Sequence, residues 1–260
     1  MMDKYQLYER SVQSPSAHLS CFLSIYQDIY HSEPRRLRED FCGTFILSCA
    51  WVKRSPRNYA WVVDLDPEPL EYGKKNHWQH LSQPEQKRLS ILKRDVLLTT
   101  QAKVDLVVAC NFSFFIFKER KILLQYFSSC LKSLRNQGVL ILEMAGGPGM
   151  ITSTREQKTV KDQEKFVYIW DQKSFDPITH DAKYSIHFKL ANGTQLKNAF
   201  NYHWRLWTIP EVRDLLEEAG FKRSIVYWES TLNGEGTGEY VSMEQGDNAY
   251  SWIAYIVGVP

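Results

Sequence analysis

The fold of this chain is decided by a stretch that reads Leu37-Arg38-Glu39-Asp40-Phe41-Cys42-Gly43-Thr44-Phe45, followed after a helical run by Trp61-Val62-Val63-Asp64-Leu65-Asp66-Pro67. We interpret this stretch as a strand, a tight turn, a helix and a second strand that ends in an acid. In an α/β nucleotide site, an acid at the end of the second parallel strand binds a ribose diol. The two carboxylate oxygens of Asp64 can accept from both hydroxyls at once.

The turn after the first strand resembles the first motif of class I S-adenosylmethionine (SAM) dependent methyltransferases, an acid-x-Gly-x-Gly-x-Gly turn. The aligned residues are Glu39, Phe41, Gly43 and Phe45, so only the middle glycine is kept. Several glycines let a backbone approach a pyrophosphate. SAM has no phosphate, so one close approach at Gly43 is enough, and the turn argues against NAD, FAD or ATP. The alternative interpretation is an ordinary βαβ unit with a chance Cys-Gly-Thr turn.

The composition indicates an ordinary globular protein. The chain has 260 residues, of which 43% are hydrophobic and 24% charged, and this length suits one α/β domain with an insertion. A net charge of +2 is far from that of a dedicated nucleic-acid binder, so we expect no nucleic-acid partner. The longest apolar stretch is too short to span a bilayer, so we expect no membrane partner.

The five cysteines are odd in number and form no Cys-x-x-Cys pair, which suggests neither a disulfide framework nor a zinc site. Free thiols in apolar surroundings fit a reducing compartment, so we expect a cytoplasmic protein. His77 and His80 have a spacing that metal ligands can have, but no third ligand is near them in the sequence. We therefore interpret them as surface histidines and predict no metal.

We predict that residues 1–35 form an N-terminal arm, or lid. The first 13 residues are too short and polar to hold a core. Ser14 and Pro15 suit the start of a helix that runs to Tyr30. In the family that the chain resembles, such a segment often closes over the cofactor. The alternative is a plain covering helix.

Beyond Asp64 the chain continues to alternate between helix and strand patterns. We predict a helix from Pro67 to His80, strands at 90–96, 105–110 and 139–144, and a helix at 118–135. The run Asp105–Cys110 is continuously apolar, as expected for a strand that is buried on both faces of a parallel sheet. After the fifth strand this alternation ends.

Residues 151–207 are predicted to be a small antiparallel β-insertion over the active site. Its strands are expected at 166–175, 184–190 and 195–203, with a hairpin turn at Asn192-Gly193. A helix follows from the capping-box pattern at Thr208–Glu211. The last strands are expected at 221–228 and 252–259, separated by a glycine-bearing excursion at 233–240.

These patterns predict a single domain, residues 1–260, of the α/β class. We expect a Rossmann-like, doubly wound, mostly parallel seven-stranded sheet with an antiparallel C-terminal hairpin strand. More narrowly, the chain looks like small, mostly uncharacterised class I methyltransferases. The marks of this likeness are the Glu39–Thr44 turn, Asn111-Phe112-Ser113, Arg205-Leu206-Trp207-Thr208 and the 236–240 loop.

The resemblance implies that SAM is the cofactor and S-adenosylhomocysteine the product. In the family, the residue aligned with Asp95 accepts from the adenine amino group, and the next backbone amide, that of Val96, meets a ring nitrogen. Asn111 is expected near the methionine end of SAM or near the acceptor. The cofactor-binding residues implied are Glu39, Phe41, Cys42, Gly43, Thr44, Asp64, Leu65, Asp95, Val96, Asn111 and Phe112.

Aromatic residues gather in the insertion and the late loops, where an acceptor would be bound. The candidate substrate-binding residues are Tyr8, Trp170, Tyr202, Trp204, Trp207 and Tyr240, with core packing as the alternative for each. A neutral amine or a thiolate needs no general base. If a base is used, His203, Glu229 and Glu239 are the candidates, and we assign no catalytic residue from the sequence.

The predicted function is methyl transfer from SAM to an unidentified small molecule by a monomer or homodimer. The alternatives are a protein or RNA methyltransferase, a non-catalytic SAM-binding protein, and a SAM-fold enzyme that transfers another group such as an aminopropyl unit. The last would need acids around Asp176, Asp181 and Glu229 for a polyamine.

Overall fold

The computed structural model describes residues 2–161, 164–232 and 235–260. The helices are α1 (Lys4–Val12), α2 (Pro15–Tyr30), α3 (Ile46–Arg54), α4 (Pro67–Asn76), α5 (Gln83–Gln86), α6 (Arg120–Ser133) and α7 (Ile209–Glu218), with short 3₁₀ helices η1 (Trp78–His80), η2 (Ser113–Ile116) and η3 (Pro148–Met150). The strands are β1 (Arg36–Asp40), β2 (Tyr59–Asp64), β3 (Leu89–Lys93), β4 (Val104–Ala109), β5 (Leu134–Gly146), β6 (Arg155–Val160), β7 (Phe166–Phe175), β8 (Asp181–Leu190), β9 (Gln195–Arg205), β10 (Arg223–Leu232), β11 (Glu235–Ser242) and β12 (Trp252–Val259). Among the helices described, none is long and apolar enough to cross a membrane.

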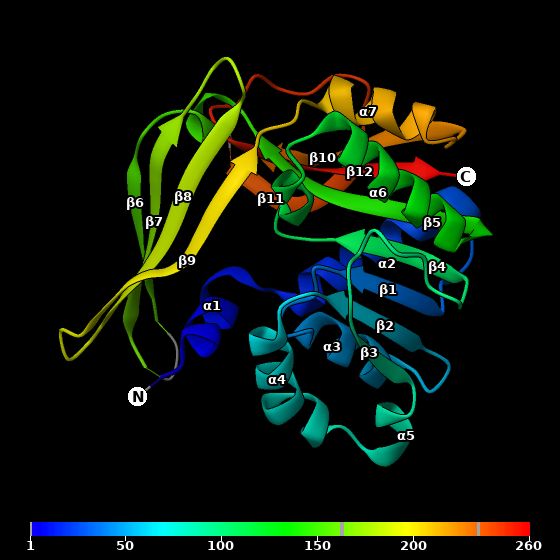
Figure 1. Cartoon of the computed structure of the whole chain (residues 1–260), viewed down its shortest axis with the longest axis horizontal. Helices are drawn as coiled ribbons and strands as arrows, with labels where there is room; N and C mark the ends of the chain where they lie inside the picture. The colour runs from blue at the N-terminus through cyan, green and yellow to red at the C-terminus, as the bar shows by residue number, and fades with distance from the viewer. Residues whose placement is uncertain (1, 162–163, 233–234) are drawn as a thin grey trace.

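Over the described residues, the central sheet has the strand order β11-β10-β12-β5-β4-β1-β2-β3 (Figure 1). Strands β1 to β5 pair in parallel, whereas β12 is antiparallel to both β5 and β10. This confirms the predicted doubly wound, mostly parallel sheet with an antiparallel C-terminal strand.

The sheet has one strand more than the seven predicted, because β11 pairs antiparallel with β10 where we expected an excursion. Its glycines at 236 and 238 and its polar residues give little strand signal, so the pairing with β10 decides its structure. Two residues of the predicted excursion, 233 and 234, lie outside the described residues.

Each face of the sheet is covered by its own helices, with α6 and α7 on one face and α2 and α3 on the other. Strand β4 shows why its sequence is apolar throughout. Val107 and Ala109 belong to the core beneath α6 and α7, whereas Leu106 and Val108 belong to the core beneath α2 and α3. Alternate side chains therefore supply two cores, as in a parallel sheet buried on both faces.

The insertion folds as a second sheet, with the order β6-β7-β8-β9 over the described residues, that stands beside the central sheet in Figure 1. Its β7–β8 and β8–β9 pairs are antiparallel, as predicted, and Gly193 has the positive φ of 86° that the hairpin turn requires. The additional strand β6 was not predicted, because its residues are almost all exposed and polar and show no alternation.

The arm contains α1, which lies between the insertion and α4 in Figure 1. Lys4 pairs with Glu68, in the first turn of α4, at 2.7 Å. Leu7 is fully buried in a small core of the insertion, with Val160, Phe166, Ile186, Phe188 and Leu190. The arm therefore joins the two sheets by an ion pair on one side and an apolar contact on the other.

Candidate active site

The predicted glycine turn lies where β1 ends, on the floor of a cavity of about 490 Å³, which we call the glycine-turn cavity. Phe41, Gly43 and Phe45 have positive φ values of 53°, 53° and 45°, a conformation that is costly for phenylalanine. A Cβ atom at Gly43 would meet no atom within 4 Å, so the space above the turn is open. The cavity is lined by residues 4, 5, 8 and 13 of the arm, 41–44 of the turn, 64 at the end of β2, 66, 68 and 69 after it, 111, 113 and 116 after β4, and 199–202 and 204 of β9.

Asp64 ends β2 and lines this cavity. Its carboxylate accepts from the backbone N–H of Gly43 at 2.8 Å and from that of Asp66 at 2.9 Å. Asp64 therefore links the turn after β1 to the turn after β2. Each oxygen retains acceptor capacity for a ligand. Burial raises the pKa of Asp64, while the hydrogen bonds from Asp66 and Gly43 oppose that shift.

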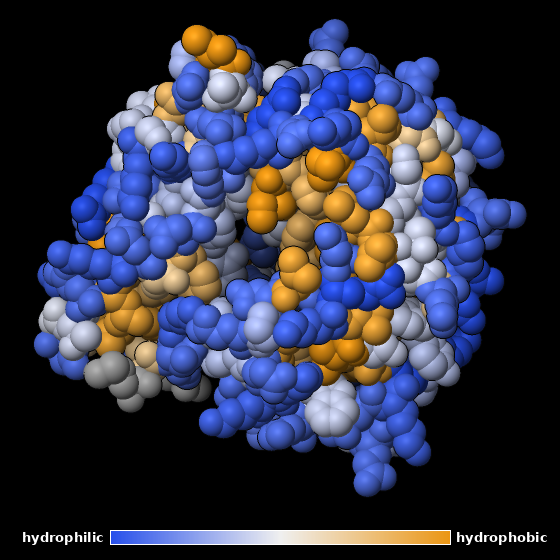
Figure 2. Space-filling view, in the orientation of Figure 1, coloured by the Kyte–Doolittle hydropathy of each residue, from blue (hydrophilic) through white to orange (hydrophobic). Residues whose placement is uncertain are grey.

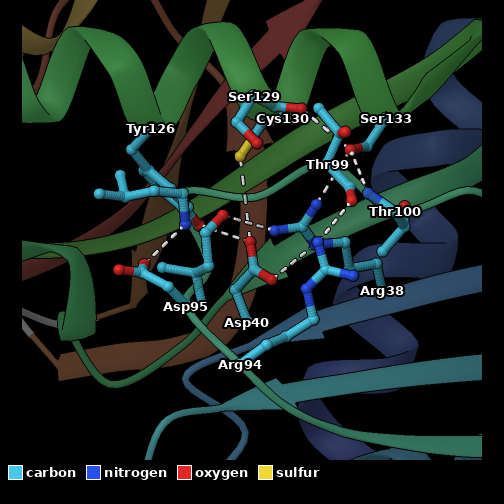
Figure 3. Close-up of polar contacts among 12 residues, drawn as sticks. Arg38, Asp40, Arg94, Asp95, Thr99, Thr100, Tyr126, Ser129, Cys130 and Ser133 are labelled. Carbon is cyan, nitrogen blue, oxygen red and sulfur yellow. Dashed lines mark hydrogen bonds and ion pairs between the residues drawn. The ribbon is translucent and has the colours of Figure 1, made fainter.

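A buried charge pair lies beneath the turn (Figure 3). The Arg38 guanidinium donates to Asp40 at 2.7 Å, to the Ser133 hydroxyl at 2.9 Å and to the Val96 carbonyl at 2.7 Å. The Tyr126 hydroxyl donates to the other Asp40 oxygen at 3.0 Å. These bonds tie β1 to α6 and to the loop after β3, so they hold the floor of the cavity in place.

Glu39 occupies the acid position of the predicted motif but does not line the cavity. Its carboxylate accepts from the backbone N–H of Ser48 at 3.1 Å and from the Ser48 hydroxyl, in the first turn of α3. These contacts satisfy a free N–H at the start of the helix. Burial raises the pKa of Glu39 to about 7, and the Ser48 hydrogen bonds oppose this rise.

The predicted cofactor residues fall into two groups. Those that line the glycine-turn cavity are Phe41, Cys42, Gly43, Thr44, Asp64 and Asn111. Those outside it are Glu39, Leu65, Asp95, Val96 and Phe112. The side chain of Leu65 is exposed, and the Asp95 carboxylate accepts from the Leu97 N–H at 2.9 Å. Arg94, the neighbour of Asp95, donates its N–H to the Asp64 carbonyl at 3.0 Å, so this loop lies beside the end of β2.

A second cavity, of about 360 Å³, lies between the central sheet and the insertion, and we call it the aromatic chamber. Figure 2 shows a hollow in this part of the surface, with hydrophobic residues gathered beside it. The chamber is lined by Tyr8, Val12, Asn111, Phe112, Ala145, Met150, Glu156, Tyr168, Trp170, Gln172, Ile186, Tyr202, Trp204, Glu229, Ser251, Trp252 and Ile253. Four of these residues, Tyr8, Asn111, Tyr202 and Trp204, also line the glycine-turn cavity and form the shared wall between the two.

The shared wall is anchored by a tight turn after β4. Asn111 and Phe112 have consecutive positive φ values of 53° and 58°, which is rare for residues other than glycine. The N–H of Asn111 donates to the Glu143 carboxylate at 2.5 Å. Strained backbone of this kind persists where the surroundings hold it, often at functional sites.

His18, Cys110 and Glu143 bring their ligating atoms within 4.8 Å of one another, a group that could hold a metal ion. Burial and the charge of Glu143 raise the pKa of the Cys110 thiol well above its usual value, so it stays protonated and is a poor ligand. Burial lowers the pKa of His18, but Glu143, 3.6 Å away, and Glu39 outweigh this effect and raise it. We therefore interpret the group as a charge pair that supports the Asn111 turn.

The predicted substrate-binding residues Tyr8, Trp170, Tyr202 and Trp204 all line the aromatic chamber. Trp207 and Tyr240 line neither cavity, so the structure does not bring them to the chamber, and their assignment stays a prediction. The Trp207 indole donates to the Phe117 carbonyl at 2.9 Å and is covered by Arg205, whereas Tyr240 packs against Tyr255. Both belong to cores, which was the alternative for every aromatic residue.

Of the candidate bases, only Glu229 lines the chamber. His203 is half exposed and bonded to Asp181 and Lys118, and Glu239 is exposed on β11. Sequence reasoning missed Glu156, because it belongs to the unpredicted strand β6, and also missed Tyr168 and Trp252. An acid on an exposed polar strand carries no signal that would have identified it.

No family model matches the sequence. No curated protein matches it either. Solved structures do resemble it. A SAM-dependent methyltransferase from Clostridium acetobutylicum has 16% sequence identity and a TM-score of 0.70, covering 98% of this chain and 97% of its own. A SAM-bound amino pentose methyltransferase from Micromonospora echinaspora has 13% identity and a TM-score of 0.71, covering 100% of this chain and 98% of its own.

A sugar N-methyltransferase from Streptoalloteichus has 15% identity and a TM-score of 0.68, covering 100% of this chain and 93% of its own. At such identities the likeness concerns the fold, and it extends over the insertion as well as the central sheet. The chain therefore has the fold of SAM-dependent methyltransferases of the class I type.

Proposed function

We propose that this chain binds SAM in the glycine-turn cavity and transfers its methyl group to a small molecule in the aromatic chamber. The observation that carries the proposal is the shared wall: two cavities, one at the carboxyl edge of the sheet and one beneath the insertion, meet at Tyr8, Asn111, Tyr202 and Trp204. A methyl donor and an acceptor must meet across such a boundary for in-line transfer.

The residues of the glycine-turn cavity suit the groups of SAM. Asp64 would accept from the ribose hydroxyls, and the open space above Gly43 would allow the ligand to approach the backbone. Leu65 and the Asp95–Val96 loop lie beside the end of β2, where the adenine of the family is expected. The methionine end would then extend toward Asn111 and the shared wall.

Transfer of a sulfonium methyl group mainly requires that the donor and the acceptor are positioned and that the site excludes water. The insertion and α1 would position the acceptor and exclude water, because they cover the chamber. Trp204 and Tyr202 come from β9 of the insertion, and Tyr8 comes from α1. Tyr8 and Tyr202 both line the shared wall, so the arm and the insertion meet there.

A small-molecule acceptor is supported by the size of the chamber and by its position between two sheets. It is also supported by the structural neighbours, which are described as an amino pentose methyltransferase and a sugar N-methyltransferase. A nucleic-acid substrate would require a track of basic residues, and none of the described residues that line the chamber is a lysine or an arginine.

The test is to incubate the protein with SAM carrying a radiolabelled methyl group and with separate metabolite, RNA and protein fractions of a cell extract. We expect label in a small-molecule product and an equal amount of S-adenosylhomocysteine. Label only in RNA or protein would contradict the small-molecule acceptor. Tight binding of SAM without transfer in any fraction would indicate the non-catalytic alternative. If the label instead stays on the nucleoside that is left over from SAM, the enzyme transfers another group of SAM, such as the aminopropyl unit.

A further inference from the structure

The lining of the aromatic chamber is acidic and not basic over the part of the chain that the structure describes. Among those residues it contains two acids, Glu156 and Glu229, and no lysine, arginine or histidine. Within the described residues, neither carboxylate forms an ion pair with a basic side chain. Glu156 is exposed and Glu229 is half-buried. Carboxylates that line one cavity without basic partners attract a cation that enters it.

Glu229 is held in place by the backbone of the β10–β11 hairpin. Its carboxylate accepts from the N–H of Gly238 at 2.9 Å. A Cβ atom at Gly236 would lie 2.5 Å from the same carboxylate oxygen, so glycine there leaves room for the acid. The pairing of β10 with β11 shifts register between Glu229 and Thr231, an irregularity of the kind that redirects side chains. The hairpin thus presents the acid to the chamber.

Aromatic faces surround the same space. Tyr202 and Trp204 lie with ring centroids 4.5 Å apart, and Trp170 lies 5.9 Å from Tyr202 and 6.3 Å from Trp204. Aromatic faces attract ammonium groups through the ring quadrupole. The chamber therefore combines the two kinds of group that bind organic cations, carboxylates and closely packed aromatic rings.

We propose that the acceptor is a small cyclic or branched amine that is bound as its ammonium ion by Glu229 and Glu156 and is methylated on that nitrogen. This inference rests on the proposed function and specifies its substrate class. It also accounts for the glycine at position 236, where a Cβ atom would meet the Glu229 carboxylate.

The chemical step balances as follows. The ammonium first gives one proton to the Glu229 carboxylate, which passes it to solvent. The nitrogen lone pair then forms a bond to the methyl carbon while the carbon–sulfur bond breaks and its electron pair stays on sulfur. The sulfonium becomes the neutral thioether S-adenosylhomocysteine, and the nitrogen becomes a methylated ammonium. One proton is released for each methyl group transferred.

The experiment uses three probes that share one ring: cyclohexylamine, cyclohexanol and cyclohexanecarboxylate. Each is titrated by ligand-observed NMR against the full-length protein in saturating S-adenosylhomocysteine. We expect the amine to bind about tenfold more tightly than the alcohol, since a hydrogen bond to a charged group is worth that much. The carboxylate should bind more weakly than either.

The variants are Glu229→Gln and Glu156→Gln, with Glu239→Gln on the neighbouring strand as the matched control. Each of the first two should reduce the preference for the amine about tenfold, and the control should leave it unchanged. Should Glu229→Gln fail to fold, Glu156→Gln on the exposed strand β6 still tests the inference. An amine that binds no better than the alcohol, or a preference that survives both substitutions, would overturn it.

Titration of S-adenosylhomocysteine into the same proteins separates this inference from the proposed function. Retained binding of S-adenosylhomocysteine without a preference for the amine would refute the amine acceptor alone. If the wild-type protein does not bind S-adenosylhomocysteine but still prefers the amine, the donor site alone is refuted.

Discussion

The two sheets of this protein build the two halves of the site in different ways. The central sheet forms the glycine-turn cavity from loops at its carboxyl edge, held by backbone hydrogen bonds to Asp64 and by the buried Arg38–Asp40 pair. The insertion forms the chamber from side chains that project from strands, such as Trp170 and Trp204. The first half depends on buried polar bonds, whereas the second depends on the choice of side chains. Changes in the first should therefore affect stability and cofactor binding, whereas changes in the second should affect mainly acceptor binding, with little effect on stability.

The largest effect is expected from Arg38→Met. Both partners of the pair are buried, so removing Arg38 leaves Asp40 without its counter-charge and should lower the free energy of unfolding by ~3–5 kcal/mol. Urea denaturation measures this change. The double variant Arg38→Met, Asp40→Leu is the control, because removing both charges should restore much of the loss. A decrease below about 1 kcal/mol in the single variant would show that the pair does not hold the floor of the cavity.

A smaller, pH-dependent effect is expected at Glu39. Its pKa is raised to about 7 in the folded protein from 4.5, so the folded state binds a proton more tightly than the unfolded state. The stabilisation is therefore present below pH 4.5 and is lost as the pH rises through 7. Relative to Glu39→Gln, the wild type should lose up to about 3 kcal/mol of stability across this range. Denaturation of both proteins between pH 5 and 8 tests it, and parallel pH profiles would contradict it.

The next effect concerns ligand binding in the first half of the site. Asp64→Ala should weaken the binding of S-adenosylhomocysteine by ~1–3 kcal/mol, because the ribose hydroxyls lose their acceptor. Isothermal titration calorimetry measures it, with thermal unfolding to establish that the variant is folded. Unchanged affinity in a folded variant would move the ribose contact elsewhere.

The smallest effect on stability is expected in the second half. Trp170→Phe keeps an aromatic ring but loses the indole hydrogen bond to Gln172, so the free energy of unfolding should fall by about 1 kcal/mol. Binding of S-adenosylhomocysteine should be unchanged, and binding of the cyclohexylamine probe should weaken. The same calorimetric and NMR titrations apply. A loss of S-adenosylhomocysteine binding equal to that of Asp64→Ala would remove the distinction between the two halves.

The fold was largely predictable because the sequence patterns that indicate most of its strands and helices are local. The strand at 252–259 has the predicted bounds, since an apolar run bounded by turn residues identifies a buried strand. Strands β6 and β11 were not predicted, because polar residues become strands there only by pairing with β7 and β10. The helix that we expected to reach His80 ends at Asn76. After His77, the chain continues to His80 as the 3₁₀ helix η1.

The site was predictable only in part, for the same reason. The Gly43 turn follows β1 and Asp64 ends β2, and these two strands are consecutive in the sequence. Their meeting in one cavity therefore follows from the parallel pairing of β1 with β2. The Arg38–Asp40 pair depends on Ser133 and Tyr126, which lie far away in the sequence. Glu156 and Glu229 come from two different sheets and meet at the chamber only in the folded protein.

The most direct test of the central claim is a crystal structure of the protein with S-adenosylhomocysteine bound. The account predicts that the ribose contacts Asp64 and that the sulfur lies at the shared wall of Tyr8, Asn111, Tyr202 and Trp204, facing the aromatic chamber. A ligand bound inside the chamber or outside both cavities, or a sulfur atom that faces away from the wall, would contradict it.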